Sequence, residues 1–207
     1  MTLARVYPIV DSAAWVARLL PTGVRLIQLR IKDCPPERLR AQIRRAQQLC
    51  LAAGSNLVIN DHWRLAIEEG CEWVHLGQGD LDAADLAALR RAGLRIGIST
   101  HDHAELDRAL RLRPDYVALG PIYPTLLKQM PFAPQGLARL AEWKQRVGAL
   151  PLVAIGGLTL ERLSGVFGAG ADSAAVVTDV VRHAQPEQRL RAWLDAAEQL
   201  APAMDSA

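Results

Sequence analysis

Two basic residues, Arg30 and Lys32, end a short apolar run in a pattern that could bind a diphosphate. Because strand side chains alternate between two faces, Arg30 and Lys32 would share a face with Gln28, and Leu29 and Ile31 would point the other way. Cations at an inward-facing strand end are costly unless they meet anions, and a diphosphate suits both arginine and lysine. Exposed charges at a strand end are the alternative, and this segment alone does not decide between the two.

Two aspartates follow the next two predicted strands, Asp61 directly after Asn60 and Asp80 in the loop after the fourth strand. Carboxylates from adjacent strand ends could face one another and hold Mg²⁺ together with a phosphate ligand. Each Asp also precedes a helical stretch and could be the N-cap of that helix. For one Asp alone the cap is the simpler interpretation, but the pair, placed opposite Arg30 and Lys32, favours the metal.

Ser99 ends the fifth predicted strand, where its hydroxyl could donate to a phosphate or to a ring nitrogen. Lys128 lies in the proline-rich segment 120–135, the one long loop, and could close over an anion, although by itself it is an ordinary loop lysine. His101 and His103 are interpreted as solvated loop and cap residues, and His62 receives no role.

Paired glycines, Gly156 and Gly157, follow the seventh predicted strand, and Thr178 follows the eighth. These positions match the usual phosphate site of parallel barrels, where backbone N–H groups and a helix N-terminus bind the charge. A glycine-rich turn followed by a helix cap is the alternative. Together with the basic segment, the pattern predicts two anion sites and suggests the joining of two phosphorylated molecules.

Eight short strands are expected to alternate with eight helices, which is the signature of parallel βα units. The strands are predicted at Arg5–Val10, Leu26–Arg30, Asn56–Ile59, Trp73–Leu76, Arg95–Ser99, Tyr116–Leu119, Leu152–Ala154 and Ser173–Val177. The helices are predicted at Ser12–Leu20, Pro36–Ala53, Trp63–Glu69, Asp82–Ala92, Ala104–Arg111, Gly136–Val147, Leu160–Ala169 and Glu187–Gln199. The count, and polar residues at the ends of many strands, favour a closed parallel (β/α)₈ TIM barrel over an open doubly wound sheet.

The chain of 207 residues fits one α/β domain, residues 1–207, with a frayed tail at 200–207. A net charge of +2 without a long basic block argues against nucleic acid as a partner. No apolar run approaches the roughly 20 residues that cross a bilayer, so no membrane partner is expected. Three cysteines without a CxxC pair suit a reduced, cytoplasmic setting. The sequence leaves open whether the protein is a homo-oligomer.

Several segments together resemble the thiamine phosphate synthase family. They are QLRIKD, NDHWRLA, HLGQGD, GISTH, PTLLKQMPFAPQGL, AIGG and AVVTD, and they follow the order and spacing of that family from about Tyr7 to Val181. The resemblance implies a transferase that condenses hydroxymethylpyrimidine diphosphate with a thiazole phosphate. The products are thiamine phosphate and pyrophosphate, and the reaction is dissociative, with pyrophosphate leaving before the thiazole nitrogen attacks.

The resemblance also implies a role for each matching residue. The pyrimidine diphosphate would bind Gln28, Arg30, Lys32, Asn60, Ser99 and Lys128, of which Arg30, Lys32, Ser99 and Lys128 would be catalytic. The thiazole phosphate would bind Thr125, Gly157, Val177 and Thr178, and Mg²⁺ would bind Asp61 and Asp80. Leu29, Ile31 and Leu127 lie within the same motifs and complete the predicted substrate-binding set.

Three positions depart from the family pattern. Leu127 replaces the second Thr of the usual Thr-x-Thr-Lys, and the loss of one neutral hydrogen bond should weaken thiazole binding by about 1 kcal/mol. Gly79 stands where an acidic residue is common, and Thr178 replaces Ser and keeps the hydroxyl.

Two other functions fit the same fold. A thiazole tautomerase would need a proton-shuttling base and no diphosphate site, so the retained Arg30, Lys32, Asp61, Asp80 and Lys128 argue against it. A non-catalytic phosphate-binding homologue is encouraged only by Leu127.

Overall fold

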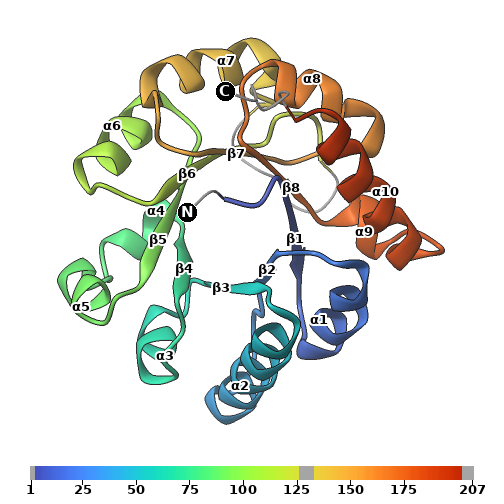
Figure 1. Cartoon of the computed structure of the whole chain (residues 1–207). Helices are drawn as coiled ribbons and strands as arrows, with labels where there is room; N and C mark the ends of the chain where they lie inside the picture. Colours follow the sequence, from blue (N-terminus) through green and yellow to red (C-terminus); the bar gives the residue numbers. More distant parts are fainter. Residues whose placement is uncertain (1–2, 126–132, 202–207) are drawn as a thin grey trace, which may run out of the picture.

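A computed structural model describes residues 3–125 and 133–201, and within these ranges eight parallel strands form a closed barrel (Figure 1). The strands are β1 (Val6–Val10), β2 (Leu26–Leu29), β3 (Asn56–Asn60), β4 (Trp73–Leu76), β5 (Arg95–Thr100), β6 (Tyr116–Leu119), β7 (Leu152–Ile155) and β8 (Ser173–Val176). Each strand pairs with its neighbours in sequence, and β1 closes the ring on β8. The predicted fold and all eight strands are confirmed.

The helices form an outer ring around the strands (Figure 1). They are α1 (Ala13–Leu19), α2 (Pro36–Ala53), α3 (Trp63–Glu68), α4 (Gln78–Leu81), α5 (Leu86–Arg91), α6 (His103–Arg111), α7 (Gly136–Val147), α8 (Leu163–Gly168), α9 (Thr178–Val181) and α10 (Pro186–Gln199), with 3₁₀ turns at Leu20–Thr22 and Leu160–Arg162. The helix predicted over Asp82–Ala92 begins later, because the Asp85 side chain accepts a hydrogen bond from the backbone N–H of Ala88 and caps α5. The short helices α4 and α9 were not predicted.

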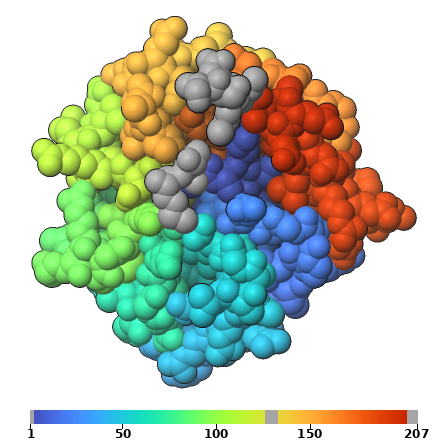
Figure 2. Space-filling model, viewed as in Figure 1, coloured from blue at the N-terminus to red at the C-terminus, as the bar shows by residue number. Residues whose placement is uncertain are grey.

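Two apolar layers hold the barrel together. The larger layer lies between the strands and the helices, and the smaller one fills the barrel interior with side chains such as Tyr7, Trp73 and Tyr116. Leu3, just before β1, belongs to the inner layer, and in Figure 2 the blue N-terminal residues lie at the centre of the ring of elements. The N-terminal segment therefore packs at the end of the barrel where the strands begin.

Three further observations bear on the sequence-based expectations. Cys34, Cys50 and Cys71 are free thiols, and burial raises the pKa of Cys50 and of Cys71 to about 12. None of the helices in the described ranges has the length and hydropathy of a membrane span. Of the predicted tail, Leu200 and Ala201 follow α10, and the remaining residues lie outside the described part of the chain.

Candidate active site

A cavity of about 950 Å³ opens at the end of the barrel where the strands terminate. Its lining comes from the ends of all eight strands and from the loops that follow them. The predicted site residues that line the cavity are Gln28, Arg30, Lys32, Asn60, Asp61, Asp80, Ser99, Thr125, Gly157, Val177 and Thr178. The volume is at the upper end for small-molecule sites and suits two small substrates side by side.

The two aspartates meet at this cavity. Burial, the negative charge of Asp80 and a hydrogen bond with the Asp80 side chain raise the pKa of Asp61, and the positive charges of Lys32 and Arg30 act in the opposite direction. All four charged groups are therefore close enough to interact. The predicted meeting of the cationic segment with the paired carboxylates is present in the structure.

Neither aspartate is a helix N-cap, so the alternative interpretation is wrong for both. Asp61 has a left-handed backbone (φ 64°), and the cap position of α3 is occupied by His62. Asp80 is a residue of α4, and its carboxylate accepts a hydrogen bond from the backbone N–H of Gly77 at 3.0 Å. That bond helps to fix the Asp80 carboxylate, which lines the cavity and interacts with Asp61.

His62 links the loop that carries Asp61 to the segment that carries Lys32. Its Nε2 lies 3.0 Å from the carbonyl oxygen of Ile31, which is between Arg30 and Lys32 in the chain. The Arg30 backbone N–H in turn donates to the Val10 carbonyl at 2.8 Å. The basic segment is thus held on both sides although it lies beyond the end of β2.

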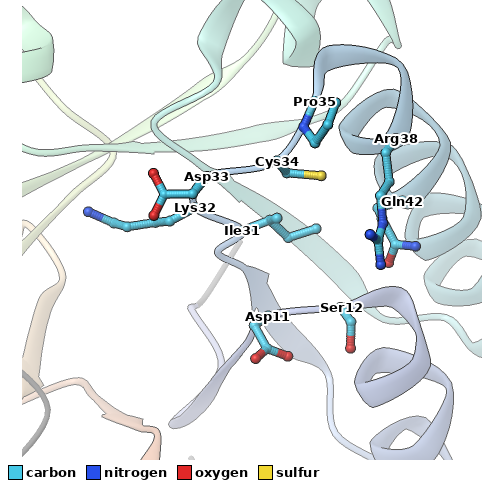
Figure 3. Close-up of a pocket in the computed structure, with 9 residues that line it drawn as sticks. All are labelled: Asp11, Ser12, Ile31, Lys32, Asp33, Cys34, Pro35, Arg38 and Gln42. Carbon is cyan, nitrogen blue, oxygen red and sulfur yellow. The ribbon is translucent and has the colours of Figure 1, made fainter.

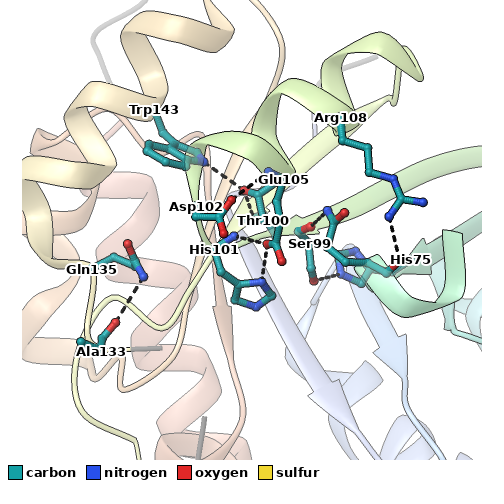
Figure 4. Close-up of polar contacts among 12 residues, drawn as sticks. His75, Ser99, Thr100, His101, Asp102, Glu105, Arg108, Ala133, Gln135 and Trp143 are labelled. Carbon is teal, nitrogen blue, oxygen red and sulfur yellow. Dashed lines mark hydrogen bonds and ion pairs between the residues drawn. The ribbon is translucent and has the colours of Figure 1, made fainter. Parts of the chain in front are cut away.

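Ser99 belongs to a chain of buried polar groups inside the barrel. Its hydroxyl lies 2.8 Å from Nε2 of His75, and Nδ1 of His75 lies 2.8 Å from the Tyr116 hydroxyl (Figure 4 shows His75 and Ser99). Burial lowers the pKa of His75 to about 4, with a smaller lowering by Arg30 that the charge of Asp80 opposes. His75 is therefore neutral at physiological pH.

The predicted phosphate end of the cavity depends on two glycines. Gly156 and Gly157 have left-handed backbones (φ 94° and 65°). A Cβ on Gly157 would stand 2.5 Å from the Pro124 carbonyl oxygen, and the backbone N–H of Tyr123 donates to the Gly156 carbonyl at 3.0 Å. The start of the loop after β6, which carries Thr125, therefore packs directly on this turn.

Comparisons with known proteins match this arrangement. A family model described as thiamine monophosphate synthase matches residues 6–180. The thiamine-phosphate synthase of Rhizobium etli is 63% identical over 196 residues, which cover 95% of this chain and 96% of that protein. That of Cronobacter sakazakii is 53% identical over 176 residues, which cover 85% and 84%. The chain belongs to the thiamine monophosphate synthase family.

A solved structure shares the fold of this thiamine monophosphate synthase family member over nearly its whole length. The thiamine phosphate pyrophosphorylase from Pyrococcus furiosus superposes with a TM-score of 0.86, covers 96% of this chain and 97% of that chain, and is 24% identical. The likeness confirms the barrel. As a member of the family, the chain is a transferase of thiamine biosynthesis.

Four of the predicted synthase residues need correction or lie outside the described ranges. Leu29 packs in the layer between strands and helices, because it points away from the face that carries Gln28. Ile31 packs against the same layer, so neither side chain lines the large cavity. Leu127 and Lys128 lie outside the described residues.

A smaller hollow of about 260 Å³ adjoins the synthase cavity. It lies on the loops after β1 and β2, and Ile31, Cys34 and Arg38 are in its lining (Figure 3). Lys32 borders both spaces, and Figure 3 shows its side chain extending away from Arg38. The Lys32 ammonium is thus available to the larger cavity.

Sequence reasoning missed the buried partners of Ser99 in this synthase. Tyr7, His75 and Tyr116 stand within otherwise apolar strands, and they received no role in the sequence-based prediction. One sequence feature could have predicted them: each carries a hydroxyl or a ring nitrogen at an inward-facing position of β1, β4 or β6. His101 was interpreted as a loop residue, yet it lines the cavity, and its Nδ1 lies 2.7 Å from the Glu105 carboxylate (Figure 4).

Proposed function

We propose that this enzyme joins hydroxymethylpyrimidine diphosphate to a thiazole phosphate and releases pyrophosphate with the assistance of Mg²⁺. The observation that carries the proposal is the meeting of Arg30 and Lys32 with Asp61 and Asp80 at one cavity. Two cations beside two carboxylates suit a ligand that is itself a metal-bound polyanion. The proposal rests on this geometry together with membership of the family.

The residues fit a magnesium ion that is shared with the substrate. No cluster of three or more His, Cys, Asp or Glu side chains within residues 3–125 and 133–201 could hold a metal without further ligands. Mg²⁺ commonly takes one or two carboxylates and completes its coordination with phosphate oxygens and water. Burial is the largest cause of the raised pKa of Asp61, and the negative charge of Asp80 adds to it, so a cation beside both carboxylates would offset their repulsion. Asp61 and Asp80 are therefore the proposed ligands.

Each step of the proposed reaction is assigned to groups that line the cavity. The bond between the methylene carbon and the diphosphate oxygen breaks, and the oxygen keeps the electron pair. Arg30 and Lys32 neutralise the charge that grows on the departing pyrophosphate. When bound, Mg²⁺ adds positive charge beside the same oxygens. Gln28, Asn60 and Ser99 hold the pyrimidine in place.

The second substrate then supplies the new bond. The lone pair of the thiazole nitrogen attacks the methylene carbon, and no proton transfer is needed to balance the step. Gly157, Val177, Thr178 and Thr125 line the opposite side of the cavity and are proposed to hold the thiazole phosphate. The arrangement calls for charge stabilisation and orientation more than for a strong base.

The test is an assay of pyrophosphate release by the purified full chain. The chain is given both substrates with and without Mg²⁺, and then the pyrimidine diphosphate alone. Release that requires the metal and yields thiamine phosphate supports the proposal. Isomerisation of a thiazole without pyrophosphate release, or binding of both ligands without turnover, contradicts it.

A further inference from the structure

A row of polar groups runs across the barrel interior beneath the cavity, and it joins Gln28 to Ser99. The Gln28 Nε2 donates to the Tyr7 hydroxyl at 2.8 Å, and the Tyr7 hydroxyl lies 2.8 Å from that of Tyr116. The Tyr116 hydroxyl is 2.8 Å from Nδ1 of His75, and Nε2 of His75 is 2.8 Å from the Ser99 hydroxyl. The three middle members are buried.

A glycine in β5, Gly97, leaves room for this row of polar groups inside the barrel. Gly97 pairs with His75 on one side and with Tyr116 on the other in the strand register. A Cβ on Gly97 would stand only 2.0 Å from the Tyr116 ring. The ring therefore occupies the space that a side chain at position 97 would need. The ring therefore crosses β5 and stacks on His75, with 5.5 Å between ring centroids.

Since Gln28 donates to Tyr7, the direction of each further bond follows from the requirement that every buried proton in the row has an acceptor. A tyrosine hydroxyl has one proton, and a neutral imidazole has one N–H. Because Gln28 donates to Tyr7, the Tyr7 proton is directed at Tyr116, and the Tyr116 proton is directed at Nδ1 of His75. The imidazole proton then lies on Nε2 and is donated to the Ser99 oxygen.

We infer that Tyr7 and Tyr116 are positioning residues that hold His75 in its Nε2–H tautomer, so that the Ser99 hydroxyl must donate its own proton into the cavity. Ser99 would thereby present a donor to an acceptor of the substrate, a pyrimidine ring nitrogen or a diphosphate oxygen. The Nδ1–H tautomer would instead accept the Ser99 proton and leave only an oxygen facing the ligand. This inference deepens the proposed function and rests on it for the identity of the ligand.

The test reads the tautomer of His75 by ¹⁵N NMR of the full, ligand-free chain at neutral pH. Long-range ¹H–¹⁵N spectra distinguish the two tautomers, and the His75 signals are those that disappear in His75→Asn. The wild type should show Nε2–H. In Gln28→Glu the new side chain can only accept, so each bond reverses and His75 should become the Nδ1–H form. In Tyr116→Phe, Nδ1 loses its donor and both forms should appear.

The control is Ser173→Ala, which removes another buried hydroxyl from the barrel wall, one without a hydrogen-bond partner in the described structure. It should leave the tautomer unchanged. In the pyrophosphate assay, Tyr116→Phe should lower kcat roughly tenfold, as expected for one lost hydrogen bond, while Ser173→Ala keeps the wild-type rate. A wild-type Nδ1–H form, or the same tautomer in all variants, overturns the inference. Because the spectrum needs no turnover, an inactive wild type would contradict only the proposed function.

Discussion

The Asp61 carboxyl lies close enough to the Asp80 carboxyl for Asp80 to raise the pKa of Asp61, with Asp61 directly after β3 and Asp80 in α4, just after β4. Two carboxyl groups in contact and partly buried disfavour the charge that both would carry at neutral pH. The fold keeps this unfavourable pair next to Arg30 and Lys32. The proposed Mg²⁺ would offset the negative charge of this pair.

Removal of one of the two facing charges should therefore stabilise the metal-free chain. The raised pKa of Asp61 means that the folded state binds its proton more tightly than the unfolded state. Stability falls as pH rises from 3.8 through the raised pKa, and the penalty is complete above it. Asp80→Asn keeps the acceptor for Gly77 and should raise Tm by roughly 2–4 °C at pH 7.5, equivalent to about 1 kcal/mol.

The measurement for Asp80→Asn is differential scanning calorimetry without divalent metal at pH 7.5 and again near pH 3.5. The gain in Tm should shrink at the lower pH, where Asp61 is protonated in both chains. Asp195→Asn, an exposed aspartate on α10, is the control and should leave Tm unchanged at both pH values. A loss of stability in Asp80→Asn at pH 7.5 would show that the pair is not repulsive.

Lys32→Ala and Asp61→Ala should each lower pyrophosphate release by roughly 100-fold or more, because each removes a charge that acts on the leaving group. The fold should survive, since Lys32 is exposed and Asp61 is strained. Arg38→Ala removes a neighbouring cation that borders only the smaller hollow and should keep the wild-type rate. Near-normal rates in either of the first two variants would refute the assignment of the diphosphate site.

His62→Ala should raise the KM for the pyrimidine diphosphate roughly five- to tenfold, because the Ile31 carbonyl loses the bond that holds the basic segment. His62→Gln places an amide nitrogen at the same reach and should restore most of the affinity, whereas His62→Asn is too short to do so. Steady-state kinetics on the three variants make the test. Equal KM values for Gln and Asn variants would rule out this positioning role.

Gly157→Ala should destabilise the chain by more than about 2 kcal/mol. A left-handed backbone costs roughly 1–2 kcal/mol for a residue with a Cβ, and the new atom would also meet the Pro124 carbonyl. Gly168→Ala is the control, because it lies in α8 with open space around it and ordinary φ. Urea denaturation compares the two. Equal stability of both variants would contradict the close packing of the loop after β6 on the glycine turn.

The sequence predicted the barrel and the charged residues of the cavity because both follow from local patterns. Apolar runs such as Leu152–Ala154 mark strands buried on both faces, and the ends of parallel strands in a closed barrel must face one mouth. The short helices α4 and α9 were missed because four residues carry too little periodicity to be read. Their existence depends on tertiary contacts.

The buried row from Gln28 to Ser99 could not be predicted for a different reason. It depends on the register that sets Gly97 between His75 and Tyr116, and register is fixed by the whole ring of strands. Likewise, alternation correctly placed Gln28 on the inner face, but Leu29 and Ile31 were included as binding residues only because they lie within a matching motif. Motif membership does not determine side-chain direction.

The central claim is that the cations after β2 and the aspartates after β3 and β4 act on one diphosphate through a shared metal ion. Isothermal titration calorimetry of inorganic pyrophosphate binding, with and without Mg²⁺, tests it in the wild type and in the double variant Asp61→Asn, Asp80→Asn. Mg²⁺ should strengthen pyrophosphate binding to the wild type at least tenfold, and the double variant should lose that gain. The same gain from Mg²⁺ in both proteins would contradict the claim.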